Sequence, residues 1–168
     1  MLSCEKRASF LRVILLSFLA APALAQDLDR DDLRSQPYLY GSVGGFTSGA
    51  GGGVTYGFGG GADWLVYGGL GLGVDATIFG SNAYGFFVGS FDVSYHIIPS
   101  SSRIVPFVVG GIGFGGESGS ESSVAIANFG GGVNLWTGNG MALRIEVRAH
   151  VPVEGGDTHV GARVGLTF

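Results

Sequence analysis

Apolar and polar side chains alternate without a break along residues 143–151. One parity holds only apolar residues and the other holds charged residues and a histidine: Leu143, Ile145, Val147, Ala149 and Val151 against Arg144, Glu146, Arg148 and His150. Because successive side chains of a β-strand point to opposite faces, this period of two predicts a strand with one oily and one charged face. The apolar face must pack against either a protein core or lipid.

The same period recurs from Pro37 to the end of the sequence, and no helical periodicity interrupts it. Turn signals rich in Gly, Ser and Asn separate segments of about ten residues. These segments predict eight strands, at residues 38–46, 54–65, 70–79, 86–95, 105–114, 124–136, 143–151 and 159–168. In the first segment, apolar residues and glycines occupy both parities, so the pattern leaves its two faces unassigned.

An even number of alternating strands, joined by short turns and longer loops in alternation, is typical of a transmembrane β-barrel. A soluble barrel of the lipocalin kind has the opposite arrangement, with apolar residues inside and charged residues outside. Charged residues make up only 13% of the chain, whereas a soluble surface holds roughly 25–35%. Composition therefore favours an all-β, eight-stranded, antiparallel up-and-down transmembrane β-barrel. The alternative is a soluble periplasmic barrel that binds a small apolar ligand.

The parity rule sends a set of charged side chains into the predicted barrel: Asp63, Asp75, Asp92, Arg144, Glu146, Arg148 and Arg163. An arginine turned to mid-bilayer lipid would cost roughly 2–4 kcal/mol, which excludes the reversed orientation. The acids and the arginines nearly balance, as a dry interior requires, because an unpaired buried charge is costly. We therefore expect a salt-bridge network in a lumen filled by side chains, and a mainly structural role. The alternative is a gate whose ion pairs rearrange to open a low-conductance pore.

The N-terminal segment predicts export. Lys6, Arg7 and Arg12 precede an apolar run at residues 13–21. The small-residue sequence Ala-Leu-Ala follows at residues 23–25. This is the pattern of a secretory signal peptide, and the run is shorter than the ~20 residues of a membrane-spanning helix. The expected organisation is a cleaved signal peptide at 1–25, an acidic leader at 26–36 and a barrel domain at 37–168.

The remaining composition excludes several function classes. After cleavage the chain has no Lys and no Cys, and it contains 6 basic and 12 acidic residues. Nucleic-acid binding requires basic patches, so it is excluded. The histidines have no metal-ligand spacing, so no metal is expected. The stretch GIGFGG at residues 111–116 formally fits G-x-G-x-x-G, but no helix follows it, so no cofactor is expected. His150, Glu154 and His159 lie near one predicted loop, but they match no catalytic motif, and no enzymatic activity is expected.

Aromatic residues gather near both ends of the predicted strands, which is typical of the girdles of membrane barrels. On the side of the chain termini they are Tyr38, Tyr40, Trp64, Tyr67, Tyr95, Trp136 and Phe168. On the opposite side they are Phe46, Phe79, Tyr84, Phe86, Phe87 and Phe114. We expect two girdles at the two membrane interfaces.

Three stretches carry a family resemblance: NFGGGVNLW at residues 128–136, LRIEVR at 143–148 and VGARVGLTF at 160–168. They resemble the eight-stranded, OmpA-like outer-membrane β-barrels of Gram-negative bacteria, over residues 37–168. The resemblance implies a location in the outer membrane, with lipid around the barrel and both termini in the periplasm. It also implies that the terminal Phe168 is read by the outer-membrane assembly machinery. We expect the barrel to be a monomer.

Overall fold

The structure is a computed structural model that describes residues 34–47, 53–81, 85–97, 103–117, 122–137 and 140–168. The expected signal peptide and most of the expected leader lie outside the described residues. The regular elements described are β1 (Arg34–Phe46), β2 (Thr55–Tyr67), β3 (Leu70–Gly80), β4 (Gly85–His96), β5 (Ile104–Glu117), β6 (Val124–Trp136), β7 (Ala142–Pro152) and β8 (His159–Thr167). They match the eight predicted strands, with ends shifted by a few residues.

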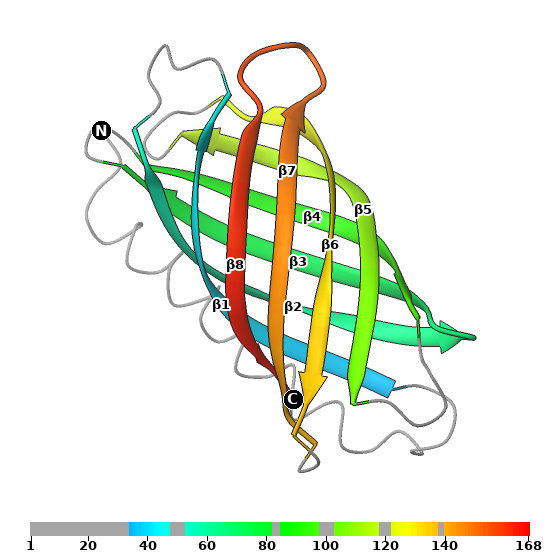
Figure 1. Cartoon of the computed structure of the whole chain (residues 1–168). Coiled ribbons are helices and arrows are strands. Elements are labelled where there is room, and N and C mark those ends of the chain that lie inside the picture. The colour runs from blue at the N-terminus through cyan, green and yellow to red at the C-terminus, as the bar shows by residue number, and fades with distance from the viewer. Residues whose placement is uncertain (1–33, 48–52, 82–84, 98–102, 118–121, 138–139) are drawn as a thin grey trace, which may run out of the picture.

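Each strand pairs antiparallel with its neighbours in sequence, and β1 pairs with β8, so the sheet closes into a barrel. Figure 1 shows the strands wrapped around one axis, with the β7–β8 link at one end and the C-terminus at the other. We call the end that carries the β7–β8 link (residues 153–158) the outer end. The opposite one is the inner end. The predicted fold class, an eight-stranded antiparallel up-and-down β-barrel, is confirmed.

Backbone geometry explains the tight turn between β2 and β3 and the closure of the barrel between β1 and β8. Gly68 and Gly69 join β2 to β3 with φ values of 54° and 89°. Both values lie in the region that favours glycine, as a two-residue hairpin with a right-handed twist requires. At the seam, the backbone nitrogen of Phe168 donates to the carbonyl oxygen of Pro37 at 2.9 Å. β1 begins at Arg34, so the last three residues of the expected leader belong to the sheet, where they pair with β2.

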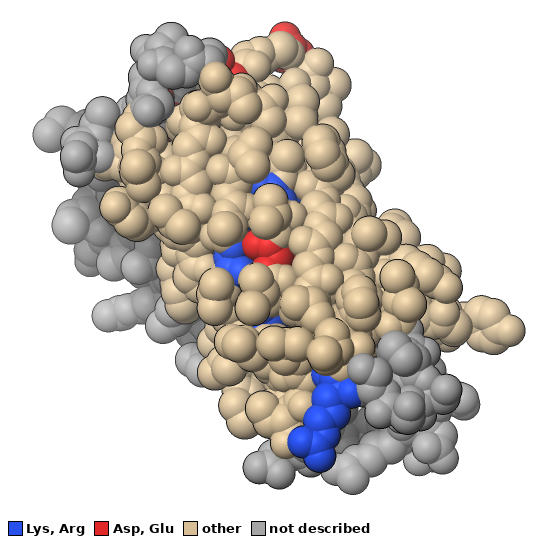
Figure 2. Space-filling view, viewed as in Figure 1, with Lys and Arg blue, Asp and Glu red and all other residues tan. Residues whose placement is uncertain are grey.

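The two faces of the wall differ as the alternation predicts. On the outside, Phe91 and Ile112 are 70% and 71% exposed, whereas Arg144 and Arg148 on the inside are 2% and 1% exposed. Figure 2 shows a wall of uncharged residues. Parts of charged residues are visible through gaps in this wall, and other charged residues lie exposed at the two ends. A water-soluble barrel would place these side chains the other way round, so the arrangement contradicts the soluble alternative.

β1, whose faces the sequence left open, turns its tyrosines inward. Tyr38 and Tyr40 are 2% and 3% exposed, whereas Leu39 between them is 45% exposed. The neighbouring strand makes room for them: a Cβ atom built on Gly61 would lie 2.6 Å from Oη of Tyr38. The glycine-rich stretch of β2 thus accommodates two large side chains in a narrow interior.

The expectation of two complete aromatic girdles is wrong for several residues. Tyr38, Tyr40 and Phe79 are buried inside the barrel, where space beside glycines and other rings admits them. An exposed aromatic set nevertheless lies near the inner end: Trp64, Tyr67, Tyr95 and Phe168. Position near a strand end is therefore not sufficient to place an aromatic side chain in a girdle, because the parity decides which face it occupies.

Candidate functional site

The charged interior begins with three consecutive inward positions of β7. Arg144, Glu146 and Arg148 lie two residues apart, so the pleat of the strand places them on one face. Glu146 accepts a hydrogen bond from Nε of Arg144 to Oε2 at 3.0 Å and one from Nε of Arg148 to Oε1 at 2.5 Å. Alternating charge along one strand thus forms a continuous chain of ion pairs.

Carboxylates on other strands extend these pairs across the lumen. Nη1 of Arg144 lies 3.2 Å from Oδ2 of Asp63 on β2. Nη1 of Arg148 lies 2.6 Å from Oδ2 of Asp92 on β4. The strands that contribute these groups are not neighbours of β7 in the sheet, so the contacts bridge the barrel interior.

The third arginine joins from β8. Nη1 of Arg163 lies 3.2 Å from Oδ1 of Asp75 on β3 and 3.4 Å from Oε1 of Glu146. The structure therefore places all the charged residues predicted to face inward in one cluster, which we call the charge network, and none is more than 3% exposed. Each has an oppositely charged partner, which offsets the cost of burying it.

Two tyrosines belong to the charge network, although the sequence pattern did not assign them to it. Tyr40 donates from its hydroxyl to Oδ1 of Asp75 at 2.8 Å, and Tyr38 donates to Oδ2 at 3.1 Å. The guanidinium of Arg144 lies 4.2 Å from the ring centre of Tyr38, and that of Arg163 lies 4.5 Å from the ring of Tyr40. A Tyr-x-Tyr pair beside a glycine run is the signal that could have found them.

Two more polar side chains extend the network. Nδ2 of Asn128 donates to Oδ1 of Asp92 at 3.0 Å. Nε2 of His96 lies 3.7 Å from Oδ2 of Asp63, and the imidazole stacks on the ring of Phe107 with 5.4 Å between centres. The network thus holds four carboxylates and three guanidinium groups, with His96 beside one of the carboxylates.

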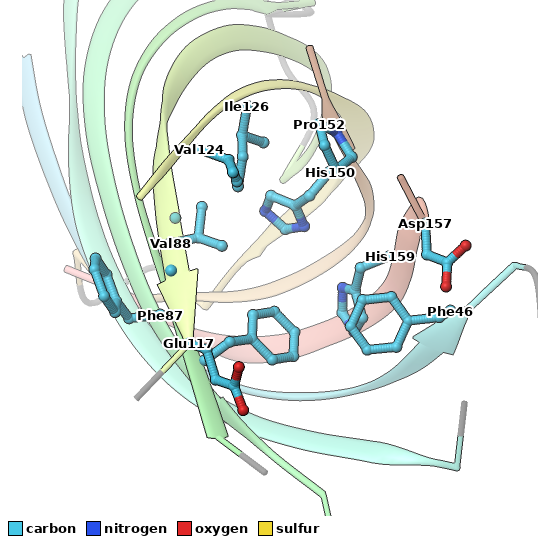
Figure 3. Close-up of a pocket in the computed structure, with 13 residues that line it drawn as sticks. Phe46, Phe87, Val88, Glu117, Val124, Ile126, His150, Pro152, Asp157 and His159 are labelled. Carbon is cyan, nitrogen blue, oxygen red and sulfur yellow. The ribbon is translucent and has the colours of Figure 1, made fainter. Parts of the chain in front are cut away.

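Toward the outer end, the interior changes from charged to apolar. Phe79, Val88 and Ile126 form a buried cluster, and Phe86 packs against it. A pocket of about 250 Å³ opens there, and its wall includes Phe86, Val88 and Ile126 but not Phe79. Figure 3 shows side chains from several strands around this pocket. The polar lumen is therefore capped by apolar side chains.

Two histidines form part of the pocket wall, as the inward parity of both predicts. Nε2 of His150 lies 3.1 Å from Nη2 of Arg163, and Nε2 of His159 lies 2.7 Å from Oγ1 of Thr55. Thr55 thus supplies a hydroxyl in contact with an imidazole, which is the first requirement for a nucleophile and its base. A nucleophile and its base also need a third group that orients the base, but Nδ1 of His159 has no partner among the described residues.

Within the described ranges, no group of three or more His, Cys, Asp or Glu side chains has the geometry to hold a metal ion. The same part of the chain contains no helix that is both long and apolar enough to span a membrane.

No protein-family model and no curated protein matches the sequence. Solved structures do match its fold. Neisserial surface protein A superposes with a TM-score of 0.65 at 14% identity, over 82% of this chain and 98% of that chain. The N-terminal β-barrel domain of OprF from Pseudomonas aeruginosa gives 0.56 at 18% identity, over 80% and 100%. The outer membrane enzyme PagL gives 0.55 at 19% identity, over 78% and 98%.

These comparisons define the class of fold. The closed barrel, the inverted distribution of charge and the similar structures together show that the chain has the fold of the eight-stranded outer-membrane β-barrels. Identities this low transfer neither activity nor site residues from any one of these proteins, since a fold hosts many functions.

Proposed function

We propose that this protein is a small integral barrel of the outer membrane with a mainly structural role and a lumen closed to ions. The charge network carries this proposal. Its side chains reach across the lumen from β2, β3, β4, β7 and β8, and the apolar cluster of Phe79, Val88 and Ile126 lies beyond it. An eight-stranded barrel is only wide enough for such side chains, so little room is left for a pore.

The energy of the network supports a lumen that stays closed. An ion path along the axis would have to separate pairs such as Arg148 and Asp92, whose atoms lie 2.6 Å apart. Breaking one buried pair costs roughly 3–5 kcal/mol, because it leaves charges without compensation. Re-pairing would therefore have to supply a new partner for each displaced group, and a thermally opened state would be rare.

Recording from planar bilayers tests closure. Purified protein, refolded into lipid vesicles and fused to the bilayer, should show no steady unit conductance. A pore-forming barrel incorporated in the same way verifies the bilayer, and the electrophoretic shift between unboiled and boiled protein verifies folding. A reproducible unit conductance in most insertions would refute the closed lumen.

The second candidate is a low-conductance pore, and the polar atoms of the lumen favour it. Oγ of Ser90, Oγ of Ser94 and both side-chain polar atoms of Asn134 are buried without a hydrogen-bond partner among the described residues. Buried polar groups without protein partners are commonly hydrated. A hydrated path with one excess carboxylate would select cations, so the recordings should include a salt gradient, whose reversal potential reports selectivity.

We further propose that the barrel is a monomer surrounded by outer-membrane lipid and that it is not an enzyme. Residues 1–25 would direct its export as a signal peptide and would then be cleaved. The apolar wall supports the lipid contact, because each apolar side chain in it would be stabilised by acyl chains. Fractionation of cells that express the whole chain tests the location. Protein recovered only in the soluble fraction would overturn it.

Assembly would depend on the C-terminal residue. The side chain of Phe168 is 46% exposed on the wall, beside the β1–β8 seam, and we propose that the outer-membrane assembly machinery recognises it. Phe168→Ala should lower the amount of folded barrel in cells. The purified variant should still refold in detergent, which separates recognition from stability.

A further inference from the structure

The pocket at the outer end has the dimensions of a ligand site. Its volume is about 250 Å³, whereas an engineered cavity of about 150 Å³ is known to bind benzene. The space therefore accommodates an aromatic ring with a short substituent. Its wall is built from described residues, most of them on strands that the barrel holds in place, with Asp157 on the β7–β8 link.

Two phenylalanine rings of the wall are packed against each other before any ligand arrives. The ring centres of Phe46 and Phe86 lie 5.4 Å apart. Phe87 also borders the pocket, but its ring packs with that of Phe114 and is exposed on the outer face of the barrel. Val88 and Ile126 add aliphatic surface. Such a wall stabilises an apolar body, and aromatic faces also attract cations through their negative quadrupole.

The rim of the pocket is acidic. Glu117 and Asp157 both contribute to it, and Figure 3 shows them on opposite sides of the ring of Phe46, with Asp157 nearer to His159. Neither carboxylate forms an ion pair with any described residue. By sequence, the segments that join the strands at this end contain no Lys or Arg. The field at the opening therefore favours a cation over an anion.

The floor of the pocket is formed in part by two histidines, and one of them lies beside a paired arginine. The guanidinium of Arg163 has only donors, so Nε2 of His150, 3.1 Å away, must accept, and the imidazole is therefore neutral with its proton on Nδ1. The charge of Arg163 itself is compensated by Asp75 and Glu146 at 3.2 and 3.4 Å. Nδ1 of His150 and of His159 are buried and have no hydrogen-bond partner among the described residues.

We infer that this pocket binds a small apolar organic cation, an ammonium group on an aromatic body, with the ring among the phenylalanines and the charge toward Glu117 and Asp157. This activity goes beyond the structural role proposed above and does not depend on whether the lumen conducts. An anion of the same size would be repelled at the rim. A neutral molecule would gain only the apolar contact.

Three matched probes test the role of charge. Phenethylammonium, 2-phenylethanol and 3-phenylpropionate have similar size and differ in charge. Binding to the refolded full barrel in dodecyl maltoside is followed by ligand-observed NMR, with empty micelles as the blank. We expect the ammonium to bind on the order of five- to tenfold more tightly than the alcohol, and the carboxylate most weakly. Equal affinities, or no binding of the ammonium, would overturn the inference.

Variants locate the site. Glu117→Gln combined with Asp157→Asn should remove the preference for the ammonium and leave the affinity for the alcohol unchanged. Glu154→Gln, in the same outer link but outside the pocket wall, is the matched control and should change neither affinity. Val88→Trp should fill the cavity and abolish binding of both probes. Each variant is accepted only if its unboiled form keeps the fast electrophoretic mobility. Undiminished binding to folded Val88→Trp would place the site elsewhere and refute the inference.

Discussion

Removal of one arginine tests the energetic role of the charge network. Arg148→Met keeps most of the apolar stem and deletes the guanidinium. Glu146 retains contacts with Arg144 and Arg163, whereas Asp92 loses its one ion-pair partner within the described part of the chain. Removing one member of a buried pair costs roughly 3–5 kcal/mol. We expect a loss of this size in the free energy of unfolding.

The assay is reversible unfolding by urea in lipid vesicles, followed by tryptophan fluorescence and by the mobility of unboiled protein. Arg103→Met provides the matched control, because Arg103 is exposed at the inner end. Its substitution should change the free energy of unfolding by less than about 0.5 kcal/mol. The double variant Arg148→Met, Asp92→Asn removes the uncompensated charge as well, so it should recover about 1–3 kcal/mol relative to the single variant.

Either of two results would contradict a stabilising role for the pair of Arg148 and Asp92. One is a loss for Arg148→Met no larger than that for Arg103→Met. The other is additive behaviour of the double variant, because two residues in one ion-paired network must show coupling when the pair contributes to stability.

Three further substitutions probe the wall, the interior and the packing of β1. Val147→Arg turns a charge to lipid and should destabilise the barrel by roughly 2–4 kcal/mol in vesicles; an unchanged midpoint would mean that this face does not meet acyl chains. Tyr40→Phe removes a hydroxyl that donates to a buried carboxylate at 2.8 Å, so urea titration should show a loss of about 1.5–3 kcal/mol. Gly61→Ala adds a Cβ atom that would overlap the backbone oxygen of Val74 and lie 2.6 Å from Oη of Tyr38, and it should cost about 1–3 kcal/mol. Gly80→Ala, where the added atom meets nothing within 4 Å, should be nearly neutral, and equal effects of the two would contradict the packing argument.

Most of the fold was predictable because a β-strand has a period of two. Once Leu143, Ile145 and Val147 occupy one parity, the charged residues between them must occupy the other, and the cost of arginine in lipid decides which face looks inward. The same rule predicted the strand count and the inward set of charges. It was silent on β1, where glycine and apolar residues occur on both parities.

The local pattern determined which face each charged residue occupies, but it could not determine which groups meet. Contacts such as Arg148 with Asp92 and Tyr40 with Asp75 join strands that are distant in sequence, and the register of the closed sheet sets their relative heights. The pocket is likewise a product of closure, since its phenylalanines, histidines and carboxylates come from different strand ends. A period of two specifies only inside or outside; position around and along the barrel is decided by the pairing of all the strands together.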